Sequence, residues 1–177
     1  MPFAPSANRA SVALVLAGVD EALQLALIRR AEFDGDPWSG HMALPGGRAL
    51  PTDRDARAVA ERETEEEIGL RLVGDHYLGG LSDLPIMRLG VDTGMILSPF
   101  VYYIGSETPA FTPSGEVAEA QWIALEHLWS RRNHTTLEIQ RQGRPATFRA
   151  IALGDHLVWG LTFRVLSLLG GVIGHPL

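Results

Sequence analysis

The sequence contains no cysteine, and its acidic residues outnumber its basic ones. Without cysteine among its 177 residues, the chain can form no disulfide, no thiolate zinc site and no cysteine nucleophile. Its 21 acidic and 15 basic residues give a formal net charge of −6. A protein of this charge needs a concentrated basic patch to bind nucleic acid, so we expect no such partner. The nearest candidate patch is a group of four arginines that we interpret as a solvated loop: Arg131, Arg132, Arg141 and Arg144.

A hydrophobic run long enough to span a membrane is also missing. The longest apolar stretch, 157–173, is interrupted by Arg164 and by several glycines, so it is too short and too polar for a membrane span. The first nine residues lack the basic and apolar segments of a signal peptide. We therefore expect a cytoplasmic protein with no membrane partner. The length and the apolar content of 46% favour a single domain over residues 1–177.

The N-terminal part of the chain predicts strands joined by turns. The β-branched apolar run at 10–17 is typical of a buried strand, and residues 22–29 are its expected hairpin partner, although 23–28 could be helical on propensity alone. A polar loop and a short strand follow, and Pro45-Gly46-Gly47 ends that strand. The loop is expected at 30–41 and the strand at 42–44. Further strand candidates, two of them separated by a loop at 85–93, are 71–82, 96–104, 118–124 and 146–153.

Two longer segments predict helices. Residues 53–68 are the best candidate, with Asp53 as the N-cap, Asp55 as a first-turn acid and Gly69 just beyond the C-terminus. Residues 157–169 have apolar residues at the spacing of one buried helix face, and a short helix is expected at 125–131. This order of elements predicts an α/β fold with layers around one mixed sheet.

The helix at 53–68 places three carboxylates on one face. At about 100° per residue, Glu63, Glu66 and Glu67 fall within a sector about 100° wide. The neighbouring cation, Arg62, cannot neutralise all three, and their mutual repulsion raises their pKa values. A solvated surface helix is the alternative, but glycines at fixed distances before and after the helix favour a site for divalent cations. Carboxylates and glycine carbonyls suit Mg²⁺ or Mn²⁺, which indicates chemistry on a phosphate anhydride.

Residues 47–70 resemble the motif of the Nudix hydrolase family. The family pattern is Gly, five residues, Glu, seven residues, Arg-Glu, an apolar residue, any residue, Glu-Glu, any residue, Gly and an apolar residue. Here 62–70 read Arg-Glu-Thr-Glu-Glu-Glu-Ile-Gly-Leu and match the second half, with Thr64 at the apolar position. In the first half, which begins at Gly47, Asp53 replaces the glutamate and eight residues rather than seven precede Arg62.

This departure is similar to the coenzyme A pyrophosphatase branch of the family. Segments 40–47, 78–85 and 158–162 also resemble that branch, whereas Ala31 and Asp36 stand at two positions of its arginine signature. The resemblance implies a Nudix-type α/β/α sandwich with a central mixed β-sheet. It also implies Mg²⁺- or Mn²⁺-dependent hydrolysis of the pyrophosphate bond of coenzyme A or a similar nucleotide derivative. ADP-ribose, NADH or a nucleoside triphosphate as substrate, a non-catalytic binding module, and a homodimer are left open.

The resemblance also implies roles for individual residues. Glu63 and Glu67 are the expected principal metal ligands, and Glu66 is either a ligand or helps to deprotonate the attacking water. The Gly47 carbonyl is a further candidate ligand, and Arg62 is expected to orient the glutamates.

Other candidate site residues lie outside the helix. Glu116, preferred over Glu119, is a candidate additional base or ligand, with an exposed turn glutamate as the alternative. Trp38 either stacks on a base or pins its loop. Four residues are candidate substrate contacts, although the arginines could be solvated strand ends and the histidine could be structural: Arg29, Arg30, His41 and Arg48.

Overall fold

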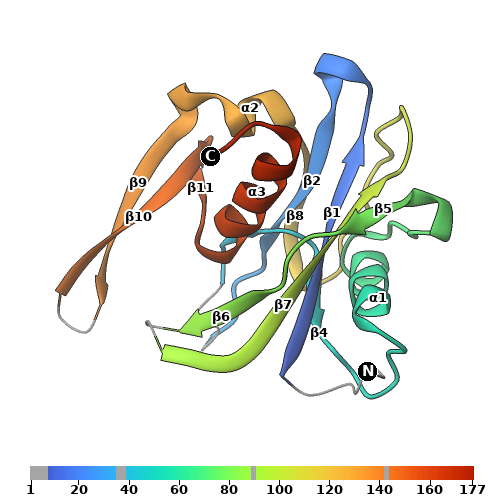
Figure 1. Ribbon diagram of the computed structural model, residues 1–177, viewed down its shortest axis with the longest axis horizontal. Helices are drawn as coiled ribbons and strands as arrows, with labels where there is room; N and C mark the ends of the chain where they lie inside the picture. Colours follow the sequence, from blue (N-terminus) through green and yellow to red (C-terminus); the bar gives the residue numbers. More distant parts are fainter. Residues whose placement is uncertain (1–7, 35–38, 89–90, 142–143) are drawn as a thin grey trace.

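A computed structural model of the chain has a mixed eight-stranded sheet as its middle layer (Figure 1). The structure describes residues 8–34, 39–88, 91–141 and 144–177. The strands of this sheet are β1 (Arg9–Ala17), β2 (Gln24–Arg30), β3 (Met42–Ala43), β4 (Gly46–Arg48), β5 (Tyr77–Gly80), β6 (Leu84–Arg88), β7 (Val91–Tyr103) and β8 (Val117–Ala124).

The larger sheet has the order β3-β2-β1-β7-β5, with β8 beside β2, β4 beside β1 and β6 beside β7. Strands β1 and β7 are parallel, whereas β1 and β2 form an antiparallel hairpin. A smaller sheet has the order β11-β10-β9. Its strands are β9 (His134–Arg141), β10 (Arg144–Leu153) and β11 (His156–Trp159). The helices are α1 (Ala56–Ile68), α2 (Leu125–Trp129) and α3 (Gly160–Ile173), with 3₁₀ turns η1 (Asp20–Ala22), η2 (Gly74–His76) and η3 (Arg131–Asn133).

The central strand β1 is buried on both faces of the sheet. Leu14 and Leu16 belong to a core cluster that includes residues of α3 and of the smaller sheet. Ala13 and Val15, which point to the opposite face, belong to a second cluster that includes residues of α1. The expected α/β layers around a mixed sheet are therefore confirmed, and the smaller sheet is an addition to them. Within the described ranges, no helix is long and apolar enough to cross a membrane.

The start of α1 differs from the predicted start, and its end agrees with the prediction. The helix begins at Ala56 rather than at Asp53, and its N-cap is Asp55, whose Oδ1 accepts a hydrogen bond of 2.7 Å from the Ala58 N–H. Asp53 is not the cap because its carboxylate is bound elsewhere, to Arg62. Gly69 ends the helix with a φ of 73°, as the sequence predicts.

Two expected loops are hairpins in the structure. The predicted loop at 85–93 contains most of β6 and the start of β7, which pair in an antiparallel manner. The predicted arginine-rich loop is divided between η3 and the hairpin of β9 and β10. In both cases antiparallel pairing satisfies the backbone, and glycine and proline do not prevent it.

Two further segments were predicted wrongly because each of them pairs with a neighbouring strand. Residues 157–159 were expected to begin the last helix, but they belong to β11 and pair with β10, so α3 begins only at Gly160. Pro45-Gly46-Gly47 was expected to end a strand, but residues 46–48 form β4 and pair with β1. Sequence periodicity alone does not reveal such pairing.

We expect the substitution Asp55→Ala to lower the free energy of unfolding by about 1 kcal/mol, because the Ala58 N–H loses its acceptor. Denaturant unfolding would measure the change. Asp55→Asn is the matched control, since it keeps an acceptor oxygen and removes only the charge. Equal destabilisation by the two substitutions would contradict the capping role.

Candidate active site

Glu67, near the C-terminal end of α1, is the most deeply buried carboxylate of that helix. Its exposed fraction is 4%, and its Oε2 accepts a hydrogen bond of 2.8 Å from the Gly46 N–H. Gly46 has a φ of 154°, and a Cβ atom there would lie 2.2 Å from the carbonyl oxygen of Ser11. Glycine is therefore required where β4 packs against β1. This close packing directs a backbone donor at Glu67.

Gly47 leaves the space that the Glu63 carboxylate occupies. A Cβ atom on Gly47 would lie 2.4 Å from the carboxyl carbon of Glu63 and 2.4 Å from its Oε1. Any side chain at this position would displace the carboxylate. The structure thus brings together the glycine segment and the acidic helix face, which are separate in the sequence.

Arg62 connects the acidic groups around the start and the face of α1. Its Nε and Nη2 donate to the two carboxylate oxygens of Asp53 at 3.0 and 3.1 Å. Its Nη1 donates to Glu63 at 2.9 Å and to Glu66 at 2.8 Å, and Nη2 also donates to the Arg48 carbonyl at 3.1 Å. Hydrogen bonding to Asp53 is the largest of the causes that raise the pKa of Arg62. Arg62 therefore holds one carboxylate oxygen each of Glu63 and Glu66 by a hydrogen bond.

Asp53 anchors this network. Burial alone would raise the pKa of Asp53, but hydrogen bonds from Arg62 and from the Leu50 N–H hold that pKa below its ordinary value. The longer spacer between Asp53 and Arg62 therefore still brings a carboxylate to the arginine. An ionised Asp53 that binds the guanidinium in a bidentate manner fixes Arg62 in one orientation.

A loop from another part of the chain completes the site. The Thr112 N–H donates to the Ile68 carbonyl and the Ser114 N–H to the Glu67 carbonyl, both at 2.9 Å. These bonds satisfy carbonyls at the end of α1 that have no partner within the helix. They also hold the loop so that Glu116 lies near Glu67.

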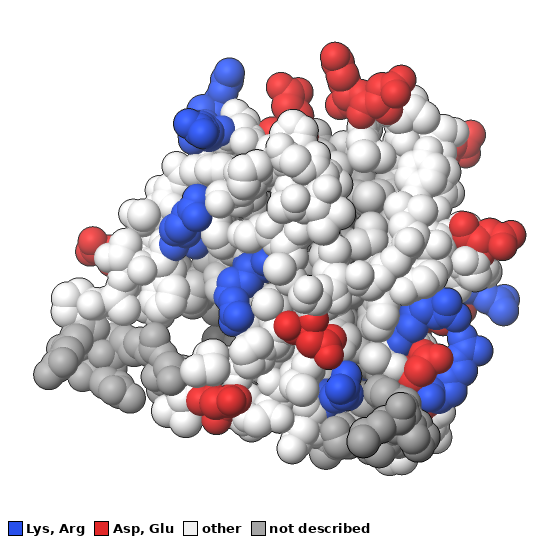
Figure 2. Space-filling view, viewed as in Figure 1, with Lys and Arg blue, Asp and Glu red and all other residues white. Residues whose placement is uncertain are grey.

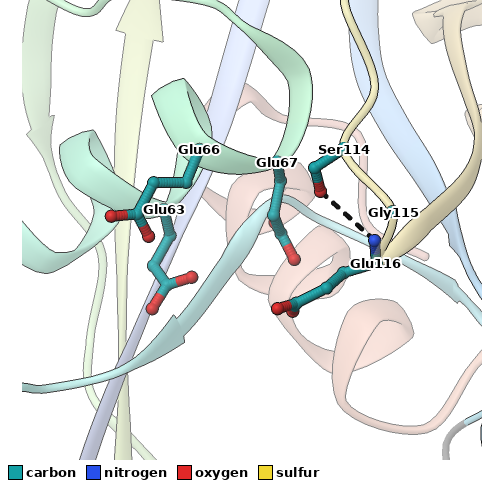
Figure 3. A pocket seen from close by; sticks show the side chains of 6 residues that line it. All are labelled: Glu63, Glu66, Glu67, Ser114, Gly115 and Glu116. Carbon is teal, nitrogen blue, oxygen red and sulfur yellow. Dashed lines mark hydrogen bonds between the residues drawn. The ribbon is translucent and has the colours of Figure 1, made fainter.

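The loop and the helix together form a pocket of about 310 Å³. The Ser114 hydroxyl accepts a hydrogen bond of 3.3 Å from the Glu116 N–H, and the Glu116 side chain points toward the α1 carboxylates (Figure 3). The carboxylate of Glu66 points to the side, away from Glu116. The residues that line the pocket are Glu63, Glu66, Glu67, Ser114, Gly115 and Glu116.

The pocket has more negative charge than its positive groups neutralise. Burial raises the pKa of Glu67 to about 7, against the hydrogen bond from Gly46 and with a contribution from the Glu63 charge. Burial also raises the pKa of Glu63, although Arg62 opposes this. Since Arg62 is shared among several carboxylates, the ionised forms of these glutamates lack sufficient compensating charge.

Each of the three α1 carboxylates in the pocket accepts a hydrogen bond through one of its oxygens. Arg62 holds one oxygen of Glu63 and one of Glu66, and the Gly46 N–H holds one of Glu67. As they stand, the His, Asp and Glu side chains of the described residues form no group of three that could hold a metal ion.

None of the predicted substrate contacts lines the pocket. Arg30 is close enough to Glu67 for its charge to lower the glutamate's pKa. Arg29 pairs with Glu119 at 3.7 Å across β2 and β8, so Glu116 and not Glu119 faces the pocket.

His41 and Arg48 make other contacts. The His41 ring packs edge-on against Trp159, with 5.1 Å between ring centres. The side chain of Arg48 is exposed, and its carbonyl accepts from Arg62. The predictions for Asp36 and Trp38 lie outside the described residues. Ser114 and Gly115 were not predicted as site residues, because only long-range hydrogen bonds bring this segment to α1.

Comparisons with known proteins place the chain in a family. It matches the model of the NUDIX domain over residues 7–142. The uncharacterized protein C14C4.10c of Schizosaccharomyces pombe is 37% identical over 116 residues, which cover 64% of this chain and 35% of that protein. The uncharacterized Nudix hydrolase NudL of Yersinia pestis is 29% identical over 128 residues, which cover 72% of this chain and 62% of that protein. The chain therefore spans less than two thirds of either relative.

Solved structures share the fold. A MutT/nudix family protein from Enterococcus faecalis has a TM-score of 0.63 and 19% identity, over 98% of this chain and 65% of that one. A bifunctional NMN adenylyltransferase/ADP ribose pyrophosphatase from Francisella tularensis, complexed with AMP and a manganese ion, has a TM-score of 0.52 and 19% identity, over 71% and 36% of the chains. Identities this low establish the fold alone, whereas the domain model extends over most of the chain. On that match, the chain belongs to the Nudix domain family.

Proposed function

We propose that this protein is a pyrophosphohydrolase that uses divalent cations to cleave the anhydride bond of a nucleoside diphosphate derivative. The observation that carries the proposal is the convergence of Glu63, Glu67 and Glu116, from two separate segments, on one pocket beside Gly46 and Gly47. Membership of the Nudix family supports it, because the paired glutamates of the family motif line this pocket.

The donor set of the pocket fits a hard divalent cation. Carboxylate and carbonyl oxygens are the ligands that Mg²⁺ and Mn²⁺ prefer. The raised pKa of Glu67 reflects a charge that a cation would stabilise. Glu63 and Glu67 would be the principal ligands, with Glu66 and the Gly47 carbonyl as further ones. Bound cations would acidify a coordinated water and offset the charge of the phosphates.

Residues of the chain would prepare the substrate and the proton transfer. Glu116 accepts no hydrogen bond from the described residues and faces the pocket, so it is the preferred group to take the proton of the attacking water. Glu66 is the alternative for this role, although its Oε2 already accepts from Arg62. Arg30 would hold phosphate oxygens at the side of the pocket near Glu67.

Within this substrate class, we propose coenzyme A. Support comes from the resemblance to the coenzyme A pyrophosphatase branch, in which aspartate and the longer spacer precede the arginine. The contact of Asp53 with Arg62 gives that spacer a physical role. ADP-ribose is the main rival, since a protein of similar fold bears the name ADP ribose pyrophosphatase.

A substrate panel separates these alternatives. With Mg²⁺ or Mn²⁺ present, we expect coenzyme A to be converted into phosphopantetheine and adenosine 3′,5′-bisphosphate faster than ADP-ribose, NADH or nucleoside triphosphates are cleaved. Chromatography of the products would measure this. Preferential cleavage of ADP-ribose would remove coenzyme A but keep the pyrophosphohydrolase, whereas no cleavage of any compound would favour a binding module.

The substitution Glu67→Gln tests the proposed role of α1 in catalysis. We expect kcat to fall on the order of 100-fold or more, because the amide cannot supply the ligand charge that the transition state requires. Glu65→Gln is the matched control, since Glu65 is exposed and does not line the pocket. Similar losses in the two variants, or full activity of Glu67→Gln, would contradict the assignment.

Glu67 should also make the metal-free protein less stable as the pH rises. Its pKa of about 7 in the fold lies above the ordinary value of 4.5, so the folded state holds more protons between these values. Stability therefore falls through that window and levels off above it. In EDTA, the stability of Glu67→Gln relative to wild type should increase by about 2.5 kcal/mol from about pH 5 to about pH 8. Urea unfolding measures it, and a constant difference would contradict the raised pKa.

A further inference from the structure

The start of α3 packs against the segment that contains β3, residues 40–43. Trp159, the last residue of β11, places its ring beside those of His41 and Phe148, with 5.1 and 5.7 Å between ring centres. Thr162, in the first turn of α3, donates its hydroxyl to the Met42 carbonyl at 3.3 Å. None of these residues lines the carboxylate pocket, and α3 packs on the side of the sheet opposite to α1.

The layer that contains α3 is poorly suited to bind phosphate directly. Figure 2 shows that the face of the molecule over α3 carries few charged side chains. Arg164, the charged residue of this helix, donates to the Pro85 carbonyl at 3.2 Å. An effect of this layer on an anionic substrate therefore has to pass through the backbone of the larger sheet.

Segment 40–43 connects the start of α3 to Arg30 at the end of β2. The Arg30 N–H donates to the His41 carbonyl, and the Arg30 carbonyl accepts from the Gly40 N–H, both at 3.1 Å. Successive carbonyls of a strand point in opposite directions, so the His41 carbonyl faces β2 and the Met42 carbonyl faces away from it. Thr162 binds that outward carbonyl. The segment is therefore held from both edges.

The other neighbour of β2 holds Arg30 less regularly. The pairing of β2 with β8 shifts its register between Arg29 and Arg30, and such an irregularity disrupts the ladder of hydrogen bonds locally. The backbone position of Arg30 therefore depends on segment 40–43. This position matters for the pocket, because Arg30 lies close enough to Glu67 for their charges to interact.

We propose that Trp159 and Thr162 are positioning residues that hold Arg30 at the carboxylate pocket through segment 40–43. The inference rests on the proposed function in that Arg30 is taken to bind phosphate oxygens of the substrate. Loss of either contact loosens one edge of the segment and misplaces the guanidinium. The expected cation ligands should stay in place, because the Gly46 N–H and Arg62 hold them from other elements.

Steady-state kinetics with Mn²⁺ and the best substrate of the panel test this role. Trp159→Ala and Thr162→Val should each raise KM about fivefold or more and change kcat less than about twofold, because a contact made equally in the ground and transition states is weakened. Trp159→Phe keeps an aromatic ring and Thr162→Ser keeps the hydroxyl, so both should restore KM to within about twofold of wild type. A KM that stays at the wild-type value in Trp159→Ala and Thr162→Val would overturn the proposal.

Trp129→Ala is the matched control. Trp129 is also a partly buried tryptophan that packs against the core around α3, but its Nε1 donates to the His175 carbonyl, beyond the C-terminal end of the helix. Its removal should lower the melting temperature and leave KM unchanged. An equal rise in KM in Trp129→Ala and Trp159→Ala would contradict the proposal, because it would indicate only a general loosening of α3.

Hydrogen exchange of the full chain in EDTA measures the same coupling without a substrate. The N–H groups of Arg30 and Gly40 should exchange about tenfold faster in Trp159→Ala than in wild type or Trp129→Ala, because their bonds open more often. Unchanged exchange at both groups in Trp159→Ala would overturn the proposal. If the wild-type protein cleaves no compound of the panel, the proposed hydrolysis fails, and the exchange rates then decide by themselves whether Trp159 positions Arg30.

Discussion

The hydrogen bond from the Gly46 N–H to Glu67 is the contact on which the rest of the site depends. It joins β4 to α1, and it exists because glycine allows β4 to pack directly against β1. Next to Gly46, Gly47 leaves room for the Glu63 carboxylate. The carbonyls at the end of α1 accept hydrogen bonds from the loop that contains Glu116. A hydrogen bond between backbone and carboxylate thus sets the position of the acidic groups relative to the sheet.

The same arrangement lowers the stability of the metal-free protein. Arg62 neutralises the outer part of the helix face through Asp53, Glu63 and Glu66, but Glu67 is buried with only a backbone donor. Placing a carboxylate in this way sacrifices stability, which is common at functional sites, and the proposed cation would offset this cost.

The sequence predicted the parts of the molecule that depend on local patterns. The acidic face of α1, its end at Gly69 and the hairpin of β1 and β2 follow from periodicity and turn chemistry. Asp53 was misassigned as a cap because its partner, Arg62, lies nine residues away and the folded loop brings the two together. The pairing of β4 with β1 and the contact of Ser114 with Glu67 depend on segments distant in sequence, which one sequence without relatives does not reveal.

The most direct test of the account is Mn²⁺ binding measured by electron paramagnetic resonance. The central claim is that the missing side chain of Gly47 lets the Glu63 carboxylate complete a cation site. Gly47→Ala should weaken Mn²⁺ binding about tenfold or more, because the new Cβ displaces that carboxylate. Gly115 lines the same pocket, and a Cβ atom added there would lie in open space. The Gly115→Ala variant should therefore bind Mn²⁺ like the wild type. Equal Mn²⁺ affinity in wild type and Gly47→Ala would contradict the account.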